Sequence, residues 1–172
     1  LLIDHEGGRV ARLGQPNWPV YPSAGVYSKL YDTNPALAFP ALQALAPLLA
    51  SELSIVGISV NCYSVAALLH SGADKVIGDR AYGDCPNKVS VLAQSAAQGT
   101  INGGIIPMIK HLPGHGRADV DSHKELPVVR ASLNDLRKTD FIPFSYLSYL
   151  PCAMTAHVIY TAIDPINCAT LS

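Results

Sequence analysis

The stretch GGIIPMIKHLPGHGRADVDSHKELP, residues 103–127, decides the fold and indicates where the chemistry of the chain lies. An apolar run of strand length starts after the glycine pair and stops at Lys110 and His111. Ligands of α/β proteins gather at the carboxyl ends of parallel strands, so a loop rich in proton carriers at such an end predicts a functional site rather than a solvated surface loop. The titratable side chains that follow the strand are His111, His115, Asp119, Asp121 and His123.

Three further apolar segments of strand length are found on either side of this stretch. With the run at 105–109, the predicted strands cover residues 1–3, 55–63, 105–109 and 152–158. They do not alternate polar and apolar side chains, which is typical of buried parallel strands. Each ends in polar residues, so these ends are expected to meet at one edge of the sheet.

Segments rich in Ala and Leu separate the strands and predict helices at residues 36–53, 86–98 and 133–150. Pro47 should kink the first of them, and Pro143 should break the last, which Ser132 caps. Residues 13–35 are rich in Gly, Pro, Ser and Asn and are expected to be an ordered loop. The alternation predicts an α/β fold of about four parallel β/α units in a single domain, residues 1–172.

Composition excludes some classes of partner. The 172 residues carry a net charge of −1 and only 15% charged side chains, which is typical of a compact globular chain. Without a basic cluster, nucleic acid is not expected as a partner. The apolar run at residues 41–50 is interrupted by Gln43 and Pro47, so neither a membrane span nor a signal peptide is expected. The four cysteines lack a CxxC pair and predict reduced thiols in a cytoplasmic protein.

Asp121-Ser122-His123 is the sharpest local chemical feature. A carboxylate two residues from a histidine can accept a hydrogen bond from one ring nitrogen, which leaves the other nitrogen to carry protons near neutral pH. A metal site is an alternative, since His111, His115, Asp119, Asp121 and His123 are all metal-competent ligand types. Glycines and Pro113 make a poor rigid frame for a metal, so no metal and no cofactor are predicted.

Several motifs together carry a resemblance to a known family. IDHEGGRVARL (3–13), GDRAYG (78–83), IKHLPGHGRADVDSHKELP (109–127), TDFIPF (139–144) and AMTAHVIYTAIDP (153–165) follow one another as in bacterial β-N-acetylhexosaminidases of glycoside hydrolase family 3. The resemblance covers nearly the whole chain, and KH-x-PGHG-x4-DSH is a highly specific signature. It implies a (β/α)8 TIM barrel, here partial, with about four units of eight. It also implies a cytoplasmic, metal-free hydrolase that removes N-acetylglucosamine from muropeptides with retention of configuration.

The resemblance also implies roles for individual residues. Asp4, Arg12, Arg80, Lys110 and His111 would bind the sugar, because carboxylates accept from hydroxyl groups and cations donate to oxygens. His123 would be the acid/base, oriented by Asp121, in place of the usual carboxylate. No residue of this sequence matches the family's nucleophilic aspartate, so none is assigned.

Departures from the family pattern leave two other functions open. Where relatives commonly read N-x-x-P-V-x-D, the chain has Ser64 and Ala67 in place of the proline and the aspartate. A barrel needs about 250 residues, so 172 are too few to close one. The first alternative is a non-catalytic sugar binder or an oligomer that associates through open barrel edges. The second is a metal-dependent hydrolase that uses the histidine-rich loop.

Overall fold

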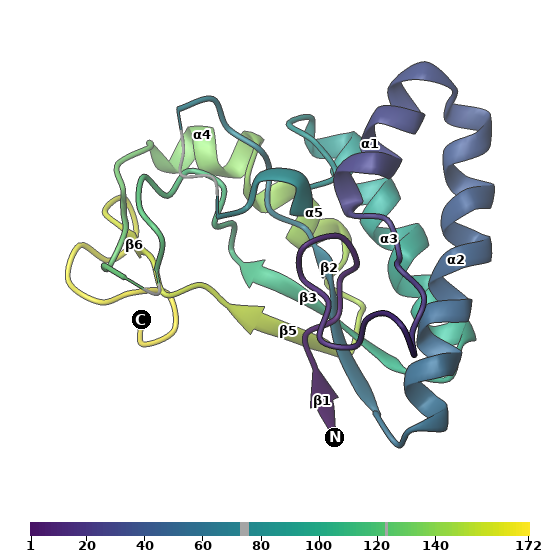
Figure 1. Cartoon of the computed structure of the whole chain (residues 1–172). Coiled ribbons are helices and arrows are strands. Elements are labelled where there is room, and N and C mark those ends of the chain that lie inside the picture. Colours follow the sequence, from purple (N-terminus) through teal and green to yellow (C-terminus); the bar gives the residue numbers. More distant parts are fainter. Residues whose placement is uncertain (73–75, 123) are drawn as a thin grey trace.

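The structure, a computed structural model, describes residues 1–72, 76–122 and 124–172, so the predicted acid/base His123 lies outside the described residues. At its centre is a parallel sheet with strand order β1-β2-β3-β5 (Figure 1). Leu2 pairs with Val60, Val60 with Ile106, and Met108 with Cys152. The four strands are β1 (Leu2–Ile3), β2 (Val60–Val65), β3 (Ile106–Leu112) and β5 (Cys152–Thr155). Each pair of neighbouring strands in this sheet is parallel, which confirms the predicted α/β architecture.

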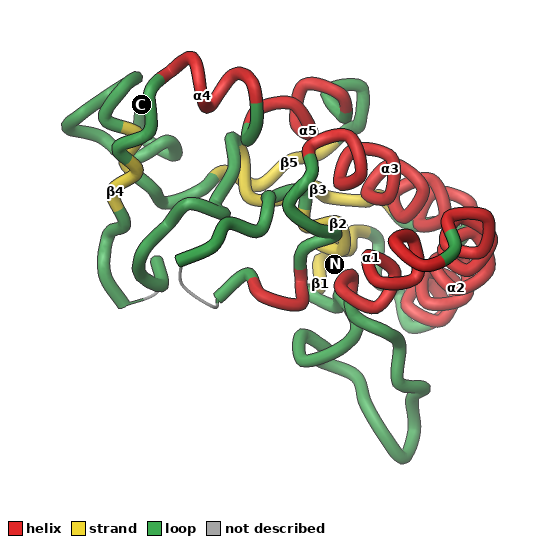
Figure 2. Tube along the Cα trace, turned by 90° about the horizontal axis from the view of Figure 1, so that it is seen from above, coloured by secondary structure: helices red, strands yellow, loops and turns green. Residues whose placement is uncertain are grey.

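The helices are α1 (Ala24–Thr33), α2 (Pro35–Ile55), η1 (Gly78–Arg80), α3 (Pro86–Asn102), α4 (Leu133–Lys138) and α5 (Phe141–Tyr146). α1, α2 and α3 pack together on one side of this sheet (Figure 2), whereas α4 lies apart from them, with Leu136 in a separate cluster with Val129 and Tyr160. The main core lies between α2, α3 and the outer face of the sheet, with Leu42, Leu49, Leu92 and Ile109 among its buried residues.

The predicted loop at 13–35 is wrong in its second half, because residues 24–33 form α1. Ser23, in extended conformation, precedes the helix, and Tyr27 is buried against the core. Tyr27 and Tyr31 are four residues apart and so share one face of the helix. Gly25 before Tyr27, and Ser28 and Lys29 after it, masked that apolar face in the sequence.

The predicted helix at 133–150 is two helices, α4 and α5, that separate at Thr139 and Asp140. Ser132 caps α4 as expected, since its hydroxyl oxygen accepts the Asp135 N–H at 3.1 Å. The break precedes Pro143, which occupies the first turn of α5, where the missing N–H of proline removes no helical hydrogen bond.

Two strand boundaries near the site also differ from those predicted from the sequence. β3 extends to Leu112, so Lys110 and His111 are strand residues rather than loop residues. The predicted strand at 152–158 is shorter, and β6 (Ile159–Tyr160) forms a separate parallel pair with β4 (Val128–Val129). This small sheet lies beyond the carboxyl ends of β3 and β5 (Figure 1).

α2 is longer than the apolar run at 41–50 on which the expectation of no membrane span was based. The helix has 21 residues, continues through Pro40 and Pro47, and is long and apolar enough by length and composition to cross a membrane. One of its faces nevertheless packs on α3, where Gly99 and Gly103 let the two backbones approach closely. Core helices of this kind meet the same length criterion.

Candidate active site

The turn after β1 places three polar residues at the carboxyl end of the sheet. His5 N–H donates to the Asn61 side-chain oxygen at 3.0 Å, and the Asn61 amide donates back to the His5 carbonyl at 2.8 Å. Gly7 then turns the chain with φ of 82°, and a Cβ there would lie 2.5 Å from the Pro22 carbonyl oxygen. The sequence Asp4-His5-Glu6 is thereby fixed against β2.

Lys110 is the centre of the site. It points from β3 toward the end of β1, is only 1% exposed, and contacts two carboxylates. Its ammonium group donates to Asp4 Oδ1 and lies 2.6 Å from Glu6 Oε1. A buried ammonium ion is stable only when it is paired and hydrogen-bonded, so the two carboxylates hold this cation in place.

Arginines complete the charge network from the outside. Arg80 grips Glu6 with two parallel hydrogen bonds, Nε to Oε2 at 2.8 Å and Nη2 to Oε1 at 2.7 Å. Arg12 approaches Asp4 more loosely, with 3.7 Å between Nη2 and Oδ2. Asp4 and Arg12 are thus the solvent-facing members of the group, with side chains 37% and 63% exposed.

Burial affects the pKa of two groups in and next to this network, His5 and Arg80. It lowers the pKa of His5, and Glu52 opposes the shift only in part. The neutral His5 ring accepts the Arg12 N–H at Nδ1 over 3.1 Å, which holds the loop that carries Arg12. For Arg80, burial lowers the pKa, but the bonds to Glu6 outweigh it and raise the pKa overall.

The histidine-rich loop folds back onto the end of β3. The rings of His111 and His115 stack edge to face with centroids 5.5 Å apart. Within the loop, His115 Nε2 lies 3.0 Å from the Ser122 hydroxyl, next to the half-buried Asp121. The Asp121 carbonyl accepts the Lys124 N–H at 2.9 Å.

The proposed metal ligands do not form a cluster in the part of the chain that the structure describes. Within residues 1–72, 76–122 and 124–172, no three His, Cys, Asp or Glu side chains are placed to share one ion. The metal alternative also uses His123, so it stays a prediction that the described residues do not test.

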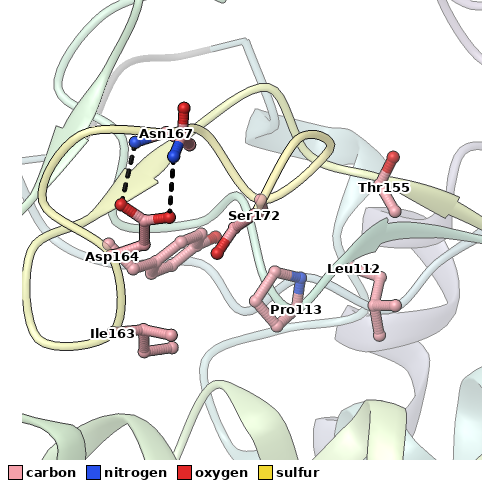
Figure 3. A pocket seen from close by; sticks show the side chains of 9 residues that line it. Leu112, Pro113, Thr155, Ile163, Asp164, Asn167 and Ser172 are labelled. Carbon is pink, nitrogen blue, oxygen red and sulfur yellow. Dashed lines mark hydrogen bonds between the residues drawn. The ribbon is translucent and has the colours of Figure 1, made fainter.

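A cavity of about 230 Å³ opens beyond the ends of β3 and β5 (Figure 3). Leu112, Pro113, Thr155 and Tyr160 line its inner side. On its outer side Asp164 accepts the backbone and amide N–H groups of Asn167 at 2.9 and 3.1 Å. These bonds and the Ile166 N–H lower the pKa of Asp164 to about 2, so an ionised carboxylate organises the loop that bounds the cavity.

Of the residues predicted from sequence, the structure brings Asp4, Arg12 and Lys110 into direct contact. Arg80 joins them through Glu6, a residue that the sequence analysis did not select. The signal for Glu6 was present in the strand-end triplet Asp4-His5-Glu6, although only contact with Lys110 distinguishes it from a solvated acid. His111 lies next to Lys110 in β3 and contacts the loop, whereas His123 is not described.

Comparison with known proteins identifies this arrangement. Residues 1–172 match the family described as the N-terminal domain of glycosyl hydrolase family 3. The chain belongs to glycosyl hydrolase family 3. A beta-hexosaminidase of Alkalilimnicola ehrlichii is 39% identical over 96% of the chain and 48% of its own length. The sequence-based assignment to this family is confirmed.

Solved structures of family 3 proteins share the fold. NagZ from Neisseria gonorrhoeae, in complex with N-trifluoroacetyl-D-glucosamine, superposes with a TM-score of 0.90 at 34% identity, over 96% of the chain and 49% of NagZ. A β-N-acetylglucosaminidase from Paenibacillus sp. FPU-7 gives 0.91 at 32% identity, over 99% of the chain and 32% of that protein. The chain spans about half the length of the curated relatives it matches. The family 3 barrel fold is thus confirmed for the segment.

Proposed function

We propose that this chain is the sugar-binding part of a retaining β-N-acetylglucosaminidase that acts on muropeptides in the cytoplasm. The observation that carries the proposal is the network of Lys110, Asp4 and Glu6 at the carboxyl ends of β1 and β3. Its exposed carboxylate and the nearby Arg12 match the hydroxyl and N-acetyl oxygens of an N-acetylated sugar. The relatives named beta-hexosaminidase support the same substrate class.

In the proposed reaction, His123 protonates the glycosidic oxygen while a carboxylate attacks the anomeric carbon. The same histidine then takes a proton from the water that resolves the glycosyl-enzyme. Asp121 orients His123. No residue of 1–172 matches the nucleophile, so we place it in the part of the fold that relatives carry beyond the matched half.

Sugar binding can be measured on the 172-residue chain itself. Titration with N-acetylglucosamine, followed by NMR chemical shifts, is expected to move the signals of Asp4, Arg12 and His111. Asp4→Asn should weaken the affinity by about tenfold or more, because a charge-assisted hydrogen bond is worth about 1.5–3 kcal/mol. Asp32→Asn, at the ion pair between α1 and Lys88 of α3, is the matched control and should bind like the parent chain. Binding that is unchanged in Asp4→Asn would contradict the proposed site.

Catalysis is tested in a full-length protein that contains this segment. Hydrolysis of a chromogenic N-acetylglucosaminide is expected there, and His123→Ala should lower kcat by about 10²-fold or more, as loss of a general acid/base does. The isolated 172-residue chain should hydrolyse the same substrate very slowly or not at all. Ordinary turnover by the isolated chain, or a full-length His123→Ala variant that remains fully active, would refute the proposed mechanism.

A second function is favoured by the apolar surface of the segment. Leu37, Leu48 and Ile55 expose more than half of their area on α2, and Leu1 and Leu2 do so at the β1 edge. We propose that the segment by itself associates with a second copy through this helix face and the β1 edge, and that it binds sugar without hydrolysing it.

A further inference from the structure

The TDFIPF motif contains a buried carboxylate that the proposed mechanism does not use. Asp140 is 0% exposed and lies at the start of α5. Three side chains donate to it: His70 Nε2 at 2.8 Å, Arg117 Nε at 2.7 Å and the Thr139 hydroxyl at 2.7 Å. Since a buried carboxylate is costly unless it is fully paired, these donors are what makes the position tolerable.

The donors come from different parts of the chain. His70 belongs to the segment after β2, and Arg117 to the histidine-rich loop after β3. Asp140 makes no capping bond to the described residues of its own helix, so its carboxylate is directed at these two loops. Arg117 also reaches Thr139 through Nη2 at 3.2 Å, which fixes the plane of its guanidinium group.

The backbone at the base of the loop is packed equally tightly. A Cβ on Gly116 would lie 1.7 Å from the Leu68 carbonyl oxygen, and one on Gly114 would lie 3.1 Å from the Asp140 Cβ. The Tyr160 hydroxyl donates to the Gly114 carbonyl at 2.5 Å. Residues 113–117 are therefore held between the segment after β2, the start of α5 and β6.

We propose that Asp140 is a positioning residue for the histidine-rich loop. Through Arg117 and His70 it fixes the base from which residues 118–122 fold back, with Ser122 on His115 and His115 on His111. The catalytic part of this inference rests on the proposed function, because the loop carries Asp121 and leads to position 123. The structural part, that Asp140 orders the loop, does not depend on catalysis.

Hydrogen exchange on the 172-residue chain tests the structural part. The Gly114 and Ala118 amides donate within the loop, to His111 and His115 carbonyls, and report its order directly. Asp140→Asn and Arg117→Ala should each speed their exchange by about tenfold or more relative to amides of α2 and α3. The partly exposed Arg117 gives a readable variant even if Asp140→Asn fails to fold. Asp32→Asn should leave the loop amides unchanged; loop exchange that is unaltered, or that rises equally throughout the chain, overturns the proposal.

Kinetics of the full-length protein test the positioning role. Arg117→Ala should lower kcat by about tenfold while KM stays within about threefold, because the sugar network is untouched. Arg117→Lys should restore part of kcat, and the Arg117→Ala/Asp140→Asn pair should lose little more than either single change. A loss that merely follows the unfolded fraction, or additive losses, overturns the role. A full-length parent that hydrolyses no N-acetylglucosaminide contradicts the proposed function instead, whatever the exchange result.

Discussion

At the residue scale, His5 is expected to make the free energy of unfolding of the chain depend on pH. Burial lowers its pKa in the folded chain, whereas the unfolded value is about 6.5. The unfolded chain therefore binds more protons between the two values, and the free energy of unfolding should fall as pH is lowered from about 7 through this window. Urea unfolding at several pH values measures it. His5→Gln should lose this part of the pH dependence, so the difference in stability between parent and variant should be largest near neutral pH and shrink toward acid; a constant difference contradicts the assignment.

Single residues also show how far the sequence could predict the site. Asp4 and Lys110 were predictable because both lie near the carboxyl ends of parallel strands, and such ends meet at one edge of the sheet. Glu6 and Asp140 were not, since each owes its role to a partner far along the chain, Lys110 in one case and Arg117 in the other. A motif marks an acid as unusual, but only the fold shows which cation pairs with it.

At the scale of elements, the contact between α2 and α3 depends on a missing side chain. A Cβ on Gly99 would lie 2.6 Å from the Ala46 Cβ and 3.1 Å from Pro47 Cδ. Gly99→Ala gains about 1 kcal/mol of helix propensity, whereas overpacking a core costs about 1–3 kcal/mol. The clash with these two atoms of α2 should outweigh the gain in propensity, so urea unfolding should show a net loss of roughly 1 kcal/mol. Gly14→Ala, with no atom within 4 Å of the added Cβ, should be nearly neutral; a more stable Gly99→Ala variant would show that the helices can separate at little cost.

The elements themselves were predictable where periodicity was long and apolar. The helices now observed as α2 and α3 and the four sheet strands were expected from such runs. The strand predicted at 55–63 is displaced, because α2 continues to Ile55 and β2 begins only at Val60. α1 was missed because Tyr27 is its only fully buried side chain, so tertiary contact rather than pattern stabilises it. The break between α4 and α5 was expected near Pro143, although proline is tolerated in a first turn and the break therefore lies before it.

At the scale of the whole molecule, half a barrel exposes surface that a closed one covers. Leu37, Leu48 and Ile55 lie 11 and 7 residues apart, which places them on one face of α2, and they are 54%, 55% and 84% exposed. With the outer side of the edge strand β1 beside Leu1 and Leu2, this surface predicts self-association of the 172-residue chain at roughly 10–100 μM, as measured by light scattering after size exclusion.

Leu48→Glu should shift the chain toward monomer with little change in Tm, because the side chain faces solvent. Gln43→Glu adds the same charge at a polar position of the same helix and should leave the oligomer intact. A parent chain that stays monomeric across this range would mean that its apolar face is too dispersed to bind a second copy, and the sugar-binding network would then have to be judged on the monomer alone.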